Sequence, residues 1–216
     1  RKISDKVFTR EELGLPKEGF VFCCFNKNYK ILPNVFDIWM RLLKKVKGSV
    51  LWLLVEDSIA EENLKKEAIK RNVDANRIIF AKRMSLSEHL ARQRIADLFI
   101  DTFPCTAHTT CSDSLWAGLP VLTRIGESFA SRVSASLLNA IDLPELITHS
   151  EKEYEDLAIE LANNINKLEE IKSKLEKNKL TKSLFNTKLF AKNIESAYTT
   201  MYERYLKDSP IENIEI

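Results

Sequence analysis

The sequence contains 216 residues, of which 44% are hydrophobic and 30% are charged. A chain of this length and composition buries a sizeable core, which excludes a disordered or low-complexity protein. Its 33 basic and 31 acidic residues leave a formal charge of +2, which gives no general attraction to nucleic acid or to an anionic membrane. We therefore expect no nucleic-acid partner and no membrane partner, and any anion must be bound locally.

Residues 1–20 are charged and lack the hydrophobic core of a signal peptide, and no apolar stretch reaches transmembrane length. The four cysteines, Cys23, Cys24, Cys105 and Cys111, lack the spacing of zinc fingers and redox motifs. We therefore expect a cytoplasmic chain whose cysteines are reduced. We also expect it to need no cofactor.

Strand-like and helix-like segments alternate over the first two thirds of the chain. Apolar runs of strand length occur at residues 20–25, 49–55, 77–81, 96–101 and 120–123. Nearly continuous apolar runs suit strands that are buried on both faces. Helical spacing fills two of the intervals, at 34–46 and at 58–72, and the second has an acidic first half and a basic second half. The alternation predicts an α/β fold with a Rossmann-like, doubly wound parallel sheet.

From Ser150 onward the pattern is helical only. Ser150 and Glu153 have the spacing of a capping box, which predicts a helix start there. The helical segment from 150 to 178 is followed by a break at 179–186, and a second helical segment then continues to about residue 208. We expect residues 1–149 to form the Rossmann-like lobe, 150–208 to form helices that pack on it or cross from it, and 209–216 to form a frayed tail.

The loop that follows the fourth predicted strand has unusual polar residues. Ligands of open α/β sheets bind beyond the carboxyl ends of the strands. Thr110 and Asp113 have capping-box spacing, so a helix is predicted to begin near Thr109 or Thr110. Free backbone N–H groups, two threonine hydroxyls and the helix dipole would form a phosphate site there. The alternatives are simple helix capping by Thr109, Thr110 and Asp113, and a turn histidine bonded to the backbone for His108.

Basic residues follow two other predicted strands. Lys27 and Lys30 come after the first strand, and His89 and Arg92 come after the third. Their alternatives are solvated loop lysines and the exposed face of an amphipathic helix. Because the carboxyl ends of parallel strands meet at one edge, these groups converge on the suspected anion site. Neither a G-x-S-x-G elbow nor a Walker A sequence is present, so the residues alone predict a Rossmann-like domain that binds a nucleotide-like anion.

Five segments occur in an order that resembles one known family: "FCCFNKNYKILPNVFDIWMRLLKKVKGSVLWLL", "RIIFAKR", "EHLARQRIADLFIDTFPCTAHTTCSDSLWAGLPVLT", "GESFASRVSASLL" and "SLFNTKLFAKNIESAYTTMYERY". Together they resemble the C-terminal lobe of the O-GlcNAc transferase and SPINDLY family over nearly the whole chain. The resemblance implies a GT-B glycosyltransferase, in which two Rossmann-like lobes face each other and the C-terminal lobe holds the sugar nucleotide.

Members of that family transfer a sugar, with inversion, to Ser or Thr of proteins, usually behind tetratricopeptide repeats that select the acceptor. The resemblance therefore implies a hexosyltransferase with UDP-GlcNAc as donor, a protein acceptor and no metal. The SPINDLY branch uses GDP-fucose, so a protein O-fucosyltransferase stays open, as does a non-catalytic module that binds a nucleotide sugar or acts as a scaffold. The facing lobe and the repeats are missing, so we expect no activity from this chain alone.

The resemblance also implies roles for residues at the phosphate end of the donor. Lys30 matches the family lysine that contacts the diphosphate, and it is the expected catalytic residue. His108, Thr109 and Thr110 match the phosphate-binding turn. Asp113 matches the aspartate that accepts hydrogen bonds from the ribose hydroxyls.

Further residues match positions beside the base and the sugar. His89 matches the histidine that lies against the base, Arg92 matches an arginine near it, and Cys105 matches a position beside the sugar. Three residues depart from the family pattern: Lys27 replaces a glutamine of the human-like enzymes near the diphosphate, Leu86 replaces a lysine near the nucleoside, and Met84 replaces a small residue at the base. The last helical segment resembles the terminal helix that crosses back onto the N-terminal lobe in GT-B enzymes.

Overall fold

The computed structural model describes residues 1–215, and its centre is a six-stranded sheet in which every pairing is parallel. The strand order is β3-β2-β1-β4-β5-β6. The strands are β1 (Val21–Cys24), β2 (Val50–Leu54), β3 (Ile78–Ala81), β4 (Leu98–Ile100), β5 (Val121–Arg124) and β6 (Ile147–Thr148). The five predicted strands are confirmed. β6 was not predicted, because a two-residue strand produces no apolar run.

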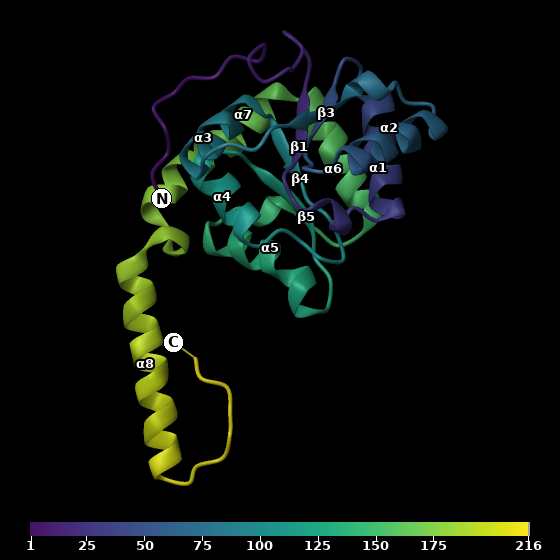
Figure 1. Ribbon diagram of the computed structural model, residues 1–216. Coiled ribbons are helices and arrows are strands. Elements are labelled where there is room, and N and C mark those ends of the chain that lie inside the picture. Colours follow the sequence, from purple (N-terminus) through teal and green to yellow (C-terminus); the bar gives the residue numbers. More distant parts are fainter. Residues whose placement is uncertain (216) are drawn as a thin grey trace.

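Helices cover the sheet on both sides, which confirms the doubly wound α/β fold (Figure 1). Three lie on one side and contact it or one another: α1 (Pro33–Lys45), α2 (Ser58–Lys70) and α6 (Glu151–Asn163). Four others form a connected group: α3 (Leu86–Arg92), α4 (Thr109–Ala117), α5 (Phe129–Ala140) and α7 (Ile165–Thr181).

The first strand and helix show why the apolar pattern folds in this way. All four residues of β1 are buried, as expected for a central strand with helices on both faces. Pro33 begins α1, where its missing N–H costs no helical hydrogen bond. The α1 side chains at helical spacing, among them Val35, Ile38 and Trp39, are fully buried against this sheet.

The helical C-terminal segment begins after Ser150, as predicted, but it contains one more break than expected. The Ser150 side chain accepts from the Glu153 N–H at 3.1 Å, and the Glu153 carboxylate accepts from the His149 N–H at 2.8 Å. The segment predicted to be helical from 150 to 178 is interrupted at Asn164, whose side chain accepts from the N–H of Lys167 and so caps α7.

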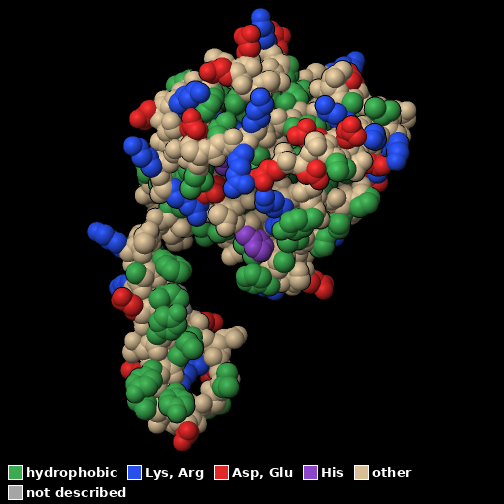
Figure 2. Space-filling model, in the orientation of Figure 1, with side chains coloured by type: hydrophobic (Ala, Val, Ile, Leu, Met, Phe, Trp, Pro, Cys, Tyr) green, Lys and Arg blue, Asp and Glu red, His purple; other side chains and the backbone are tan. Residues whose placement is uncertain are grey.

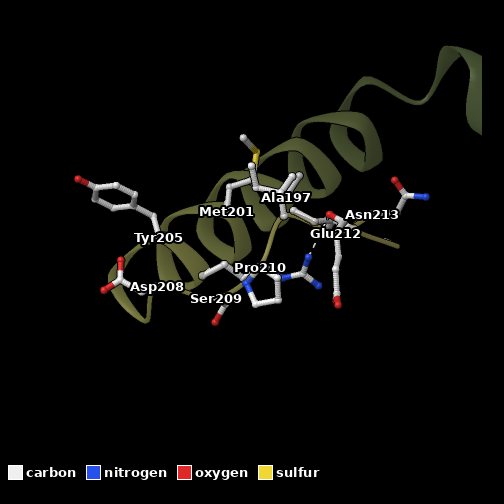
Figure 3. Close-up of a pocket in the computed structure, with 11 residues that line it drawn as sticks. Ala197, Met201, Tyr205, Asp208, Ser209, Pro210, Glu212 and Asn213 are labelled. Carbon is white, nitrogen blue, oxygen red and sulfur yellow. Dashed lines mark hydrogen bonds between the residues drawn. The ribbon is translucent and has the colours of Figure 1, made fainter.

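The last helix, α8 (Thr187–Leu206), projects from the body and has no buried residue (Figure 1). Figure 2 shows hydrophobic side chains along it. The following residues turn back beside α8, and between them lies a pocket of about 710 Å³ that Met201, Tyr205 and Pro210 help to line (Figure 3). This pocket contains none of the residues predicted to bind a ligand. Residue 216 of the predicted tail lies outside the described residues. No helix within residues 1–215 is both long and apolar enough to cross a membrane.

Candidate nucleotide-binding site

The order of the strands reverses between β1 and β4. From β1 the chain continues outward to β2 and β3, whereas from β4 it continues in the opposite direction to β5 and β6. Ligands of doubly wound sheets bind at this switch point. The loops after the two strands meet there, because the Asn26 side-chain amide donates to Asp101 Oδ1 at 3.0 Å and to Thr102 Oγ1 at 2.8 Å.

Asp101 organises the loop after β4 from below. Its side chain is fully buried, and Oδ1 accepts from the N–H groups of Thr102 and Ala107, each at 2.8 Å. Oδ2 accepts from Thr123 Oγ1 at 2.8 Å and from Ser134 Oγ at 2.7 Å. Burial raises the pKa of the Asp101 carboxyl, and the hydrogen bonds from these groups oppose that change. The carboxylate thereby joins β4, β5 and α5 beneath one turn.

Hydrogen bonds also fix the backbone of the turn that precedes α4. The Thr102 hydroxyl donates to the Cys105 carbonyl at 2.8 Å, and the Thr106 N–H donates to the Ala130 carbonyl at 2.9 Å. Lys30 Nζ donates to the Thr106 carbonyl at 2.8 Å. Lys30, which the sequence placed after a different strand, is therefore held against the predicted phosphate-binding turn.

The N-terminus of α4 differs in part from the prediction. The helix begins at Thr109, as expected, but its N-cap is His108 and none of the described side chains caps it. The predicted capping by Thr110 and Asp113 is wrong, because Asp113 lies too far into the helix to reach the first N–H groups. His108 Nε2 lies 3.3 Å from the Ala130 carbonyl, and its ring meets Phe129 edge-on. The helix therefore presents first-turn N–H groups that no side chain occupies.

Asp113 lies on the next turn of α4 and is only 8% exposed. It forms an ion pair with Arg1, whose guanidinium also donates to Ser112 Oγ at 3.1 Å. The Arg1 carbonyl accepts from the Trp116 indole at 3.0 Å. Burial raises the pKa of the Asp113 carboxyl, and the Arg1 charge acts in the opposite direction. In this structure the carboxylate therefore has a cationic partner from the N-terminal segment.

A second group of predicted residues lines a pocket of about 320 Å³ beyond β1 and β3. Four of them line it together: Lys27, Met84, His89 and Arg92. Glu56 lies at the same pocket and pairs with Lys27 at 3.6 Å and with Arg83 at 3.1 Å. The pocket thus combines an apolar wall with a charged rim, which suits a base and ribose better than a bare phosphate.

The sequence allows two environments for Arg92: the ligand site, or the exposed face of an amphipathic helix. Arg92 is 1% exposed, so it does not lie on the exposed face of an amphipathic helix. Its guanidinium donates to His89 Nδ1 and to the Lys82 carbonyl. Burial lowers the pKa of Arg92 to about 10, and burial together with the Arg92 charge lowers the pKa of His89 to about 4.

The ten predicted site residues therefore fall into two groups on one edge of the sheet. Lys30, Cys105 and residues 108–110 belong to the turn before α4, with Asp113 one turn further along that helix, and the other four line the pocket. Sequence reasoning missed Asn26 and Asp101. Their signal was present, because each is a polar residue directly after a buried apolar run. Within residues 1–215, no group of three or more His, Cys, Asp or Glu side chains could hold a metal ion.

The family model described as glycosyl transferase family 41 matches residues 2–194 of this sequence. The chain belongs to glycosyl transferase family 41. Among curated family 41 relatives, it is 36% identical over 206 residues to the UDP-N-acetylglucosamine–peptide N-acetylglucosaminyltransferase of Caenorhabditis elegans, covering 95% of this chain and 18% of the relative. It is 39% identical over 194 residues to a probable enzyme of the same name from Arabidopsis thaliana, covering 89% and 20%. The chain thus spans about a fifth of the length of these relatives.

Solved structures of family 41 and of other glycosyltransferases share this fold. A mutant O-GlcNAc transferase from Thermobaculum terrenum superposes with a TM-score of 0.81 at 29% identity, over 85% of this chain and 36% of that one. Sucrose-phosphate synthase from Thermosynechococcus elongatus gives a TM-score of 0.63 at 12% identity, over 90% of this chain and 48% of that one, which shows the fold alone. The family 41 chain therefore has the Rossmann-like architecture of one GT-B lobe.

Proposed function

We propose that this chain is the donor-binding lobe of an inverting protein O-glycosyltransferase that transfers GlcNAc from UDP-GlcNAc to Ser or Thr. The observation that carries the proposal is the pairing of a lysine with an uncapped helix start. Lys30 Nζ lies 2.8 Å from the Thr106 carbonyl, in the turn that leads into the free N–H groups of α4. A diphosphate placed there meets a full charge and a helix dipole together.

In the proposed reaction an acceptor hydroxyl attacks the anomeric carbon of the sugar and the bond from that carbon to the diphosphate oxygen breaks. The leaving diphosphate takes the bonding electrons, and the acceptor loses its proton to a group on the facing lobe. Lys30, the hydroxyls of Thr109 and Thr110 and the N–H groups of α4 stabilise the growing negative charge on the diphosphate. His108 and Cys105 lie on the same turn, beside the phosphates and the sugar respectively.

The proposed nucleoside site is the pocket lined by Lys27, Met84, His89 and Arg92, with Asp113 accepting from the ribose hydroxyls. Asp113 is paired with Arg1 in this structure, so the ribose hydroxyls would either displace Arg1 from the Asp113 carboxylate or share that carboxylate with it. An almost buried carboxylate accepts strong hydrogen bonds from hydroxyl donors, which supports this role.

The whole protein is proposed to add the facing lobe, tetratricopeptide repeats and the protein acceptor. Support comes from the fraction of the relatives that this chain covers, about a fifth. In this arrangement residues 1–149 form the donor lobe, and α8 crosses from it to the facing lobe. The exposed side chains of α8, among them Phe190, Tyr198 and Tyr202, offer an apolar surface for that contact. Because the acceptor and its proton acceptor lie on the other lobe, this chain alone is expected to be inactive.

Calorimetric titration with UDP, GDP, UDP-GlcNAc and GDP-fucose tests the proposal. We expect UDP and UDP-GlcNAc to bind at least tenfold more tightly than the guanosine ligands, which corresponds to about 1.4 kcal/mol. Tighter binding of GDP-fucose would identify GDP-fucose, and not UDP-GlcNAc, as the donor. If no nucleotide binds, the donor-lobe assignment is wrong. Transfer of GlcNAc to a peptide by the full-length protein, and loss of that transfer in a full-length Lys30→Met variant, would show that the protein is an enzyme. Absence of transfer by the full-length wild-type protein would favour a non-catalytic binding module.

A further inference from the structure

Tyr154 of α6 contacts the chain at the start of the turn before α4. Its side chain is fully buried, and its hydroxyl donates to the Asp101 carbonyl at 2.9 Å. The Trp39 indole donates to the same hydroxyl at 3.2 Å. An indole nitrogen can only donate, so the hydroxyl accepts from Trp39 and directs its own hydrogen to Asp101. Burial raises the pKa of the Tyr154 hydroxyl, which keeps it a donor.

The carbonyl that accepts this bond lies just beyond the regular pairing of the sheet. The last pair between β4 and β5 is Ile100 with Leu122. The Asp101 carbonyl belongs to the same peptide unit as the Thr102 N–H, which donates to Asp101 Oδ1 at 2.8 Å. A peptide unit is planar, so bonds at its two ends together fix its rotation. Tyr154 therefore holds one end of the first peptide unit of the turn, and the Asp101 carboxylate holds the other.

The orientation of this peptide unit sets the direction in which the chain enters the turn. The Thr102 hydroxyl accepts from Asn26 at 2.8 Å and donates to the Cys105 carbonyl at 2.8 Å, so Thr102 must stay in place for both bonds. The Phe103 ring, which follows it, meets the Tyr154 ring edge-on at 5.5 Å. A rotation of the peptide unit would therefore disturb the turn that leads to the uncapped start of α4.

The helix that carries Tyr154 is itself held against α1. Glu155, the next residue, accepts from Arg41 at 2.8 Å and from Lys45 at 2.8 Å. Together with the bond from Trp39 to Tyr154, these contacts tie α6 to α1, and the two helices lie side by side (Figure 1). The Tyr154 hydroxyl thus has a position set by two packed helices, so the turn must adapt to it.

We propose that Tyr154 is a positioning residue for diphosphate binding: its hydroxyl fixes the first peptide unit of the turn and so aligns Lys30 and the N–H groups of α4 with the phosphate oxygens. The inference rests on the proposed function and deepens it. Tyr154 is fully buried and acts through Asp101, so it needs no contact with the ligand. The pocket proposed for the nucleoside is lined by residues after β1, β2 and β3, and none of them belongs to this turn.

The test is calorimetric titration of a Tyr154→Phe variant with uridine, UMP and UDP. Phenylalanine keeps the ring that contacts Phe103 but has no hydroxyl, so the peptide unit loses the bond at one end. UDP should bind about 5- to 10-fold more weakly, which corresponds to the loss of about one hydrogen bond to phosphate. UMP should show a smaller loss, and the affinity for uridine should change less than about twofold. Equal losses for uridine and UDP, or no loss for UDP, would overturn the proposal.

Ser49→Ala is the matched control, because it also removes a buried hydroxyl that joins a donor to a backbone carbonyl. The Ser49 hydroxyl accepts from Arg77 at 3.0 Å and donates to the Val46 carbonyl at 2.7 Å. Ser49 precedes β2, so it lies at the amino ends of the strands, away from the turn. Titrated at a temperature where both variants are folded, Ser49→Ala should keep the wild-type affinity for UDP. A loss similar to that of Tyr154→Phe would mean that lowered stability alone explains the effect.

Hydrogen exchange provides a second readout that does not need the ligand. The Thr102 amide should exchange faster in Tyr154→Phe through local opening, and at its wild-type rate relative to core amides in Ser49→Ala. Unchanged relative exchange in Tyr154→Phe would refute the positioning role. If the wild-type chain binds neither uridine nor UDP, the proposed function fails, whereas hydrogen exchange reports on the Tyr154 contact independently.

The wild-type chain decides the question if Tyr154→Phe does not fold. Tyrosine labelled with ¹³C at Cζ gives paired signals in mixed light and heavy water when its hydroxyl exchanges slowly. Four of the five tyrosines are exposed, so one such pair is expected, from Tyr154. Rapid exchange of every tyrosine hydroxyl would show that Tyr154 does not hold the turn.

Discussion

Replacing Lys30 with methionine removes one charge from the proposed diphosphate site and keeps the length of the side chain. The Lys30 ammonium group has three hydrogens, and the structure uses one of them on the Thr106 carbonyl at 2.8 Å. At least one of the other two is free for a phosphate oxygen. A hydrogen bond from a charged donor contributes about 1.5–3 kcal/mol, so UDP should bind roughly 10- to 100-fold more weakly to the variant.

The assay is calorimetric titration with uridine, UMP and UDP at low and high ionic strength. The loss should grow from uridine to UDP and should shrink in salt, because a partly exposed charge is screened over about 8–10 Å. Lys66→Met, on α2 and outside the proposed site, is the matched control. Its side chain is 62% exposed and paired with Glu62 at 3.1 Å, so UDP affinity should change less than about threefold. An equal loss for uridine and UDP in Lys30→Met would show that Lys30 only braces the turn.

Three further substitutions test other parts of the structure. Tyr154→Phe leaves the buried Trp39 indole and the Asp101 carbonyl without their partner and should lower the free energy of unfolding by about 2–3 kcal/mol in urea, whereas a loss below about 0.5 would contradict the hydrogen bonds. Asp113→Asn should weaken UDP about tenfold, and unchanged affinity would leave Asp113 only its pairing with Arg1. His89 has a folded pKa of about 4, below its ordinary 6.5, so its stabilising contribution is present above pH 6.5 and is lost as the pH falls toward 4; urea titrations in which His89→Gln keeps the wild-type pH dependence would contradict this.

The sheet could be predicted from the sequence because β1, β2, β4 and β5 are almost entirely buried and β3 is at least half buried. That burial produces apolar runs long enough to recognise, as at Val21–Cys24, with helical spacing between them. The division of the helical segment at Asn164 could not be seen in the same way, since its flanking residues keep a helical pattern on both sides.

The site was predictable at the level of loops but not of side-chain partners. Parallel strands bring their carboxyl ends to one edge, so residues after β1, β3 and β4 had to lie near one another. The partner of Asp113 is 112 residues away in the sequence, and no local pattern encodes that contact. The burial of Arg92 likewise depends on Phe25 and Trp52, which come from other parts of the chain.

The five hydrogen bonds to the Asp101 carboxylate also affect the thermodynamics of ligand binding. Because the turn before α4 is shaped by bonds within the protein, its conformational entropy is lost during folding and not when a ligand arrives. A nucleotide then meets N–H groups that are already aligned, so its affinity is not reduced by an ordering step. The amide protons of Thr102 and Ala107 should therefore exchange with solvent deuterium only through extensive unfolding, and hydrogen exchange in the ligand-free chain would detect a turn that opens locally instead.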